Sequence, residues 1–394
     1  MNVLTYYYLF SFLRLFFKIG SNMLGRCFSR SYSFQDSMSS TRLPGLMGLL
    51  NYRLSCCVNS VLQSFFATEE FTEKLDRWNG PSTAAEEKCN TPLQLQRVLR
   101  VMQKDRSQTQ AHTDFLYCLH LNHIRFCVQH DADEVFLLIL NLIQQQMSDT
   151  NLAQEIRDLY KTEVRQHLKC LSCNSMHDVP NKSYFVSFPL PVYENCQTVE
   201  NCFQFFFRPQ KLTDRNKCYC NYCGEKTTTE QASSSSLVFK LISLPKVLVI
   251  HLKRFQCSGS TQKLNCKVSF REILDFQKIL HEDQHELNKG NYSVLLTCAC
   301  FPQYMYELFA VIVHSGTAVF GHYTAYIKSP GEQTWYHADD SFISTASWAD
   351  VQSTYGSSSG SKSAYMLLYR KIEEETSMSS QSTHGSELME TESK

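Results

Sequence analysis

The chain has 394 residues, 43% of them hydrophobic, which is enough to bury a sizeable core in one large domain or a few smaller ones. Lys+Arg and Asp+Glu each number 38, so the formal net charge is zero, which argues against the strong basic field of a nucleic-acid binder. The 17 cysteines are spread along a long chain, which favours a reducing compartment with free or metal-bound thiols over a disulfide scaffold.

Residues 1–44 form an apolar, aromatic extension with no acidic residue before Asp36. Its apolar stretch, residues 3–17, is short for a membrane span and contains Arg14. Two interpretations stay open: a flexible or partner-binding extension, which we prefer, and an organelle or membrane address. We expect no membrane contact from the rest of the chain.

Recognisable patterning begins near residue 45, and apolar residues recur mostly with helical spacing as far as about residue 160. The clearest helix is predicted over residues 131–147. There Asp131 can cap the helix, Glu134 can complete a capping box, and the apolar face is wide. We therefore expect this helix to be buried.

From about residue 162 the pattern changes to short strands. The clearest predicted strands are residues 184–190, 237–243, 247–252, 308–314, 323–327 and 364–369. A Gly/Ser-rich stretch, residues 356–363, predicts a loop before the last strand. The acidic, Ser/Thr-rich tail, residues 372–394, predicts disorder. Helices followed by strands indicate an α+β fold.

The sequence GLLNYRLSCCVNSVLQ (residues 48–63) predicts a turn-rich loop that leads into a helix beginning near Cys56. A thiol at a helix N-terminus lies at the positive end of the helix dipole, which favours the thiolate. Asn51, five residues earlier, can donate to a developing oxyanion. A single cysteine is more often a buried structural thiol, so Cys56 needs partners elsewhere in the chain to be a credible nucleophile.

Two downstream segments offer those partners. YELFAVIVHSG (residues 306–316) predicts a buried strand ending in a loop, and GHYTAY (residues 321–326) opens the next strand. His322, beside a glycine at a strand start, is well placed to face a cleft as a general base. In WYHADDS (residues 335–341), two adjacent carboxylates follow, and one of them can orient the imidazole.

These three segments resemble the Cys box, the His box and the third-residue segment of the ubiquitin-specific protease family, which are papain-like cysteine proteases. QHDADE (residues 129–134) and LVIHLKRF (residues 248–255) resemble the family's thumb-helix box and central palm strand. The resemblance implies that Cys56 is the nucleophile, His322 its general base and acid, and Asp339 the carboxylate that orients His322. It also implies that Asn51 donates to the oxyanion and that Asp340 supports the site.

The resemblance also implies an α+β papain-like fold over residues 45–371. It would have a helical thumb (about 45–165), β-rich fingers that bear zinc (about 166–250) and a β-sheet palm (about 251–371). Departures from the family pattern raise two questions. Arg53 stands where the family usually has glycine, which questions whether that turn needs a positive φ. Cys57 places a second thiol beside the nucleophile, where it could be oxidised with it. Neither departure removes a catalytic group, although an inactive scaffold stays open as an alternative.

Two C-x-x-C pairs in the predicted fingers are spaced as the halves of a tetrahedral four-cysteine zinc site. The candidate ligands are Cys170, Cys173, Cys220 and Cys223. Four thiolates leave no open position for water, so the predicted cofactor is a structural Zn²⁺ and a metalloprotease is excluded. The alternative is a set of unmetallated thiols, and Cys218 complicates the ligand assignment.

Four further stretches, residues 126–132, 216–224, 274–280 and 348–356, look more like the interferon-induced branch of the family. The resemblance implies a cysteine-type isopeptidase that removes the interferon-stimulated ubiquitin-like modifier from target lysines (a deISGylase). It also implies a negative role in type I interferon signalling, with a receptor chain as a further partner, and a cytoplasmic, in part nuclear, location. A general deubiquitinase and a non-catalytic adaptor at the receptor are the alternatives.

Overall fold

The structure is a computed structural model. It describes residues 42–43, 46–81, 87–103, 109–125, 128–170, 172–173, 175–178, 183–195, 197–207, 210–212, 219–226, 235–258, 260–279, 305–329 and 332–373. All of them belong to one compact unit, Ser40–Lys394, whereas a second unit, Met1–Ser39, lies outside the described residues. The predicted extension (1–44) and tail (372–394) therefore lie outside them too, apart from residues 42–43 and 372–373. None of the described helices combines the length and the apolar character needed to cross a membrane.

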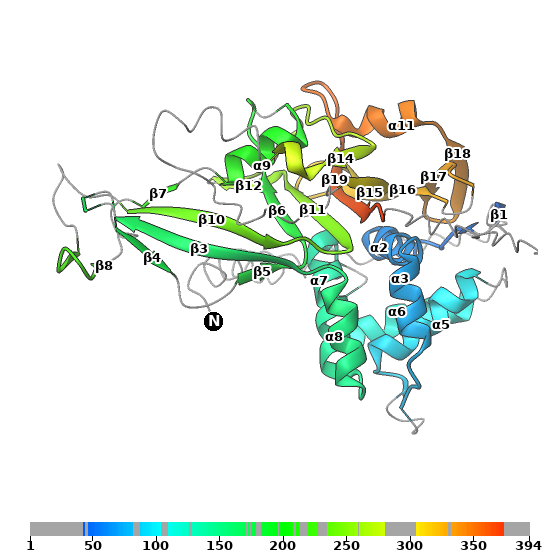
Figure 1. Ribbon diagram of the computed structural model, residues 1–394. Coiled ribbons are helices and arrows are strands. Elements are labelled where there is room, and N and C mark those ends of the chain that lie inside the picture. Colours follow the sequence, from blue (N-terminus) through cyan, green and yellow to red (C-terminus); the bar gives the residue numbers. More distant parts are fainter. Residues whose placement is uncertain are drawn as a thin grey trace, which may run out of the picture. The chain divides into compact units, whose positions relative to one another are not determined.

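The predicted helical region is present between the described start of the chain and residue 158 (Figure 1). Its elements are α2 (Cys56–Phe66), α3 (Glu69–Asp76), α5 (Thr91–Gln103), α6 (Thr109–Leu121), α7 (Ala132–Gln146) and α8 (Thr150–Asp158). Asp131 caps α7 by accepting hydrogen bonds from the backbone N–H groups of Asp133 and Glu134, as the sequence predicts. Because α7 presents fully buried side chains such as Phe136 and Ile139, it forms the centre of this helical layer.

An eight-stranded sheet carries the C-terminal half of the fold, in the order β18-β17-β16-β15-β19-β11-β6, with β14 paired to β15. The strands are β6 (Phe188–Pro191), β11 (Val247–Lys253), β14 (Ile273–Asp275), β15 (Met305–Gly316), β16 (Gly321–Lys328), β17 (Trp335–Asp339), β18 (Phe342–Ala346) and β19 (Lys362–Lys371). Their pairings are antiparallel except for β11 with β6, which is parallel.

The two faces of this sheet are buried against different helices. Ile312 of β15 lies in the cluster that includes the helical layer, while its neighbours Val311 and Val313 lie in a second cluster with α9 (Val199–Phe207). Alternate residues of a strand point to opposite faces, so β15 is buried on both sides. On the first face, α2 packs against β15, β16 and β17, and this contact brings the predicted Cys box to the predicted His box.

A second sheet, the fingers, is built on the long antiparallel pair of β3 and β10, whose partners run from Ser243↔Glu163 to Ser235↔Cys170. The two strands run side by side away from the eight-stranded sheet, and β8 lies near their far ends (Figure 1). The elements here are β3 (Thr162–Cys170), β4 (Met176–Asp178), β5 (Ser183–Phe185), β7 (Gln210–Leu212) and β10 (Ser235–Ser243), with the hairpin β8 (Tyr219–Cys220) and β9 (Glu225–Lys226).

Short elements complete the described part of the chain: β1 (Arg42–Leu43), β2 (Leu46–Met47), β12 (Phe255–Ser258), β13 (Ser260–Lys263), α11 (Trp348–Gln352) and the 3₁₀ helix η2 (Ser353–Tyr355). The pairing of β1 with β2 includes the last residues of the predicted flexible extension, so residues 42–43 are ordered by a strand partner.

The sequence and the structure differ over residues 184–190. One strand is predicted there, but β5 pairs with β3 of the fingers while β6 pairs with β11 of the eight-stranded sheet. Pro189 and Pro191 have no N–H to donate, which is tolerated because β6 is an edge strand. The eight-stranded sheet thus takes β6 and β11 from the range predicted for the fingers, because strand pairing and not local composition decides sheet membership.

Candidate active site

Cys56 is the first residue of α2 and is buried, with 3% of its surface exposed. It follows the N-cap residue Ser55, and the first turn of α2 contains no acidic residue. The positive end of the helix dipole therefore favours negative charge on the Cys56 sulfur. The packing of α2 on the sheet places this sulfur beside His322 of β16, whose pKa it helps to raise, so the two ends of the sequence motif meet.

His322 is held from its other side by Asp339 at the end of β17. The distance from His322 Nε2 to Asp339 Oδ1 is 2.6 Å. The pKa of His322 is raised to about 10, first by this hydrogen bond and next by the neighbouring Cys56. The pKa of Asp339 is lowered, chiefly by the same hydrogen bond to His322. These contacts therefore favour the protonated imidazole, which lies between the Asp339 carboxylate and the Cys56 sulfur.

Asp340 joins the turn after β17 to the loop before Cys56. Its carboxylate accepts hydrogen bonds from Asn51 Nδ2 at 2.8 Å and from Asn59 Nδ2 at 2.8 Å, and its carbonyl accepts from the Leu49 N–H at 2.8 Å. Burial raises the pKa of Asp340, against the lowering effect of these amides. Its φ of +51° is unusual for a residue other than glycine, and the surrounding hydrogen bonds hold it there.

Asn51 is fixed at both ends of its amide group. Its Nδ2 donates to Asp340, and its Oδ1 accepts from the Ser55 N–H at 3.2 Å. An amide nitrogen carries two hydrogens, so one remains to donate toward the exposed side of the loop. The structure thus brings all five predicted catalytic residues into one connected site.

Two glycines of the motifs are explained by close approaches. A Cβ on Gly48 would lie 2.2 Å from the Ser341 carbonyl oxygen, so a side chain there would separate the Cys loop from the turn that carries Asp340. A Cβ on Gly321 would lie 2.1 Å from His314 Nε2. The side-chain amide of Gln129 also forms two hydrogen bonds with the Gly321 backbone: it donates to the carbonyl at 2.7 Å and accepts from the N–H at 3.1 Å. These two bonds fix the start of β16, the strand that carries His322.

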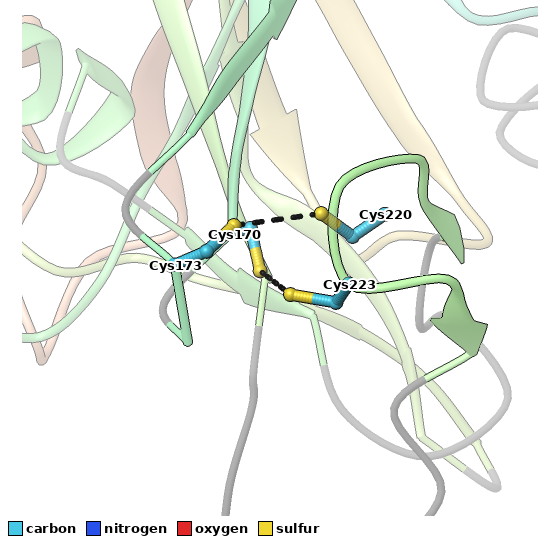
Figure 2. A group of neighbouring side chains, drawn as sticks. All are labelled: Cys170, Cys173, Cys220 and Cys223. Atoms are coloured by element: carbon cyan, nitrogen blue, oxygen red, sulfur yellow. Dashed lines mark hydrogen bonds between the residues drawn. The ribbon is translucent and has the colours of Figure 1, made fainter.

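The four cysteines predicted as ligands lie together at the far end of the fingers (Figure 2). Their sulfur atoms are all within 4.8 Å of one another. The Cys170 and Cys223 sulfurs are 3.8 Å apart, and those of Cys173 and Cys220 are 3.6 Å apart. The β3 end and the β8–β9 hairpin each contribute one C-x-x-C pair, so two segments distant in sequence converge on one point.

The family is decided by a match to the family model described as "Ubiquitin carboxyl-terminal hydrolase", which covers residues 47–369. The chain belongs to this family. It is a cysteine-type hydrolase of the deubiquitinase class, and the fold and family predicted from the sequence are confirmed.

Curated relatives share most of its length. The chain is 35% identical over 336 residues to human "Ubl carboxyl-terminal hydrolase 18", covering 84% of this chain and 86% of that protein. The mouse protein of the same name is 35% identical over 334 residues, covering 83% and 86%. Human "Ubiquitin carboxyl-terminal hydrolase 47" is 27% identical over 401 residues, covering 87% of this chain and 28% of that protein.

Solved structures share the fold. The SAGA DUB module (Ubp8, Sgf11, Sus1 and Sgf73) bound to ubiquitin aldehyde matches with a TM-score of 0.67 at 22% identity, over 85% of this chain and 71% of that chain. The same module bound to monoubiquitin matches with a TM-score of 0.65 at 21% identity, over 91% and 74%. This likeness places the α2 layer, the eight-stranded sheet and the fingers within the fold of this family.

The questions raised by Arg53 and Cys57 have structural answers. Arg53 has a φ of +67°, so the turn does require the conformation in which the family usually places glycine, and an arginine adopts it here. Cys57 has 1% of its surface exposed, and burial raises the pKa of its thiol strongly. A buried, protonated thiol is a poor target for oxidants, so this packing argues against its oxidation together with Cys56.

Sequence reasoning missed three residues that organise the site: Asn59, His112 and Gln129. Asn59 stands within the Cys box, and its position three residues into a helix that begins at Cys56 could have placed it near Asp340. Nothing in the sequence around His112 marks the partner that it meets. The structure shows its Nε2 2.9 Å from Asn59 Oδ1.

Proposed function

We propose that this chain is a thiol-dependent isopeptidase that removes the interferon-stimulated ubiquitin-like modifier from lysine side chains of target proteins, in preference to ubiquitin. The observation that carries the catalytic part is the His322–Asp339 hydrogen bond, placed beside Cys56 at the junction of α2 and the sheet. The choice of modifier is supported by the 35% identity to Ubl carboxyl-terminal hydrolase 18 over most of both chains.

In the proposed reaction, the Cys56 thiolate attacks the carbonyl carbon of the modifier's C-terminal glycine. His322, held as a cation by Asp339, donates a proton to the lysine amine as the isopeptide bond breaks. This leaves a thioester on Cys56 and a neutral imidazole. The imidazole then takes a proton from water, whose oxygen attacks the thioester, and the modifier leaves with a free carboxylate while the thiolate is restored.

The negative charge that develops on the carbonyl oxygen needs donors already in place. We assign this role to the second Nδ2 hydrogen of Asn51 and to the backbone N–H of Cys56. Asp340 supports them because it holds Asn51 by the first hydrogen. The segment from His314 to Gly321, which comprises the end of β15, the turn after it and the first residue of β16, is proposed to line a narrow channel for the glycine-rich end of the modifier.

The modifier preference can be tested by measuring kcat/KM for two fluorogenic substrates, one made from ubiquitin and one from the interferon-stimulated modifier. We expect hydrolysis of the second at least tenfold faster than of the first, and no hydrolysis of either by Cys56→Ala. Equal rates would make the protein a general deubiquitinase. A folded wild-type protein that hydrolyses neither would overturn the enzyme proposal and favour the non-catalytic adaptor.

We further propose that the four-cysteine cluster holds a structural Zn²⁺. Tetrahedral zinc with Zn–S bonds of about 2.3 Å requires sulfurs about 3.8 Å apart, and the two sulfur contacts of 3.8 Å and 3.6 Å agree with that. The ligands would be Cys170, Cys173, Cys220 and Cys223, and the metal would supply only a cross-link. Metal analysis of the purified protein should give one zinc per chain. The Cys173→Ser variant should bind less, and a zinc-free folded wild type would contradict the proposal.

A further inference from the structure

His112 lies on α6, outside every sequence motif of the active site, yet it reaches the network behind Cys56. It is almost fully buried, with 2% of its surface exposed, and its ring lies 5.7 Å from that of Tyr52 in the Cys loop. Its Nε2 is 2.9 Å from Asn59 Oδ1. A buried polar side chain on a neighbouring helix therefore contacts the catalytic helix α2 directly.

The contact sets the direction of the Asn59 amide. Asn59 Nδ2 donates to Asp340 Oδ1 at 2.8 Å and lies near the carbonyl oxygens of Leu49 and Leu50, at 3.2 Å and 3.3 Å. All three of these partners are acceptors, so the NH₂ end of the amide must face them. The Oδ1 end then faces His112, which must supply a hydrogen.

We propose that His112 is a positioning residue of the active site, whose Nε2–H fixes the Asn59 amide and, through it, the Asp340 carboxylate that holds Asn51. The series of hydrogen bonds therefore links His112 to Asn59, Asn59 to Asp340 and Asp340 to Asn51. Its last member, Asn51, carries the amide that we assign as a donor to the oxyanion. The catalytic consequence of this inference rests on the function proposed above, whereas the hydrogen-bond order does not.

The protonation state of His112 agrees with that order. Burial lowers its pKa to about 4, so the ring is neutral at physiological pH and carries one N–H. The Asn59 contact requires that hydrogen on Nε2. Without this donor, the Asn59 amide could turn its oxygen toward the Asp340 carboxylate and place two acceptors face to face. The carboxylate would then move, and Asn51 would lose its support.

The test compares four proteins: the wild type, His112→Phe, His112→Gln and Leu119→Ala. Phenylalanine keeps the ring against Tyr52 but removes the donor. Glutamine places an NH₂ group near the position of Nε2. Leu119 is buried on the same helix and serves as a control for general loss of packing.

We expect His112→Phe to lower kcat by about 10- to 100-fold, since small misplacements of catalytic groups cost this much. KM should change less than about twofold, and His112→Gln should restore most of kcat. A kcat for His112→Phe no lower than that of Leu119→Ala, or no recovery with glutamine, would overturn the proposal.

A double-mutant cycle locates the route of the effect. In an Asp340→Asn background the side chain at position 340 can match either direction of the Asn59 amide, so the His112→Phe effect on kcat should shrink. Undiminished effects in that background would mean that His112 does not act through Asp340, and would overturn the series.

A readout that does not need turnover separates this inference from the proposed function. The side-chain NH₂ signals of Asn51 and Asn59 can be followed by NMR in asparagine-labelled Cys56→Ala protein. We expect both signals to shift in His112→Phe and to return toward their original positions in His112→Gln. Signals that do not respond to His112→Phe would refute the hydrogen-bond order, even if the enzyme proposal holds. If the signals respond as expected but a folded protein with Cys56 intact hydrolyses neither substrate, only the enzyme proposal is refuted.

Discussion

The active site and the far end of the fingers are held together in different ways. At the active site, Asn51 and Asn59 form hydrogen bonds with Asp340, from which they are 289 and 281 positions away in the chain. These residues lie beside a hydrophobic core to which both the helices and the eight-stranded sheet contribute. Toward the end of the fingers, among residues 165–175 and 219–224 whose burial the structure describes, the buried ones are Cys170 and Cys220.

The two regions differ in the source of their stability: hydrophobic packing reaches one of them farther than the other. The second hydrophobic cluster reaches the fingers at Val164 and Leu241, which are at the end of the β3–β10 pair nearest the eight-stranded sheet. Farther out, the strand pairing continues to Cys170, and the buried residues among those whose burial the structure describes are Cys170 and Cys220. We therefore expect the metal to stabilise the fingers locally, while the catalytic network stands on the core and is insensitive to the metal.

Removal of the metal should give the largest effect. In isolated zinc-finger peptides a structural zinc contributes about 10–16 kcal/mol, so chelation or Cys170→Ser should unfold the end of the fingers. Hydrogen exchange should become fast at β3 and β8 but stay slow at α2 and β15. A short fluorogenic peptide with a Gly-Gly end should be cleaved at an unchanged rate. Equal loss of protection in both regions would show that the comparison is wrong.

Loss of the Asp340 carboxylate should disturb only the other region. Asp340→Ala removes the carboxylate that accepts from Asn51 and Asn59. Because Asn51 is exposed to water and Asn59 keeps the Leu49 and Leu50 carbonyls, the loss is that of an ordinary hydrogen bond, about 0.5–1.5 kcal/mol. We expect the free energy of unfolding to fall by about this amount and kcat to fall by about 10- to 100-fold. Zinc content should not change. Denaturant unfolding and metal analysis check this, and a loss of zinc would contradict it.

The pair of His322 and Asp339 should make stability depend on pH. The pKa of His322 is raised from 6.5 to about 10, so its contribution is complete below pH 6.5 and is lost as the pH rises toward 10. The pKa of Asp339 is lowered from 3.8, so its contribution is lost as the pH falls below 3.8. The stability difference between the wild type and His322→Asn should therefore be largest between these limits and shrink above pH 6.5. A difference that grows from pH 6.5 to 10 would exclude the ion pair.

The smallest effect is expected at Arg53. A left-handed residue other than glycine costs about 1–2 kcal/mol, and part of the gain from glycine is offset by its freedom in the unfolded chain. Arg53→Gly should therefore raise the free energy of unfolding by no more than about 1 kcal/mol, with kcat unchanged. Thermal unfolding measures this. A lower free energy of unfolding in Arg53→Gly would contradict this prediction. It would mean that the Arg53 side chain stabilises the fold despite its exposed position.

The sequence predicted the elements whose signals are local. The cap at Asp131, the start of α2 at Cys56 and the strands β15, β16 and β19 could be found because capping residues and apolar runs are contiguous in the chain. The division of residues 184–190 between two sheets could not be found, since it depends on which distant strand each half pairs with.

The active site shows the same limit. Its nucleophile, base and carboxylates stand in recognisable motifs, and the structure brings them together as the motifs predict. His112 stands outside these motifs, and Gln129 stands in the QHDADE motif without a signal for the contact that it makes. Each acts on a backbone or side chain more than fifty positions away, as the sequence separations of 53 and 192 show. The first contact joins α6 to α2, and the second joins the segment before α7 to the start of β16; local patterns specify neither approach.

The most direct test of the account is to map the cysteine that reacts with a modifier carrying an electrophile at its C-terminus. Peptide mass spectrometry would be applied to the wild type, Cys56→Ala, Cys57→Ala and His322→Ala. We predict one adduct, on Cys56, present in Cys57→Ala, much slower in His322→Ala and absent in Cys56→Ala. An adduct on any other cysteine, or none in a folded, zinc-loaded wild type, would contradict the assignment of Cys56 as the nucleophile.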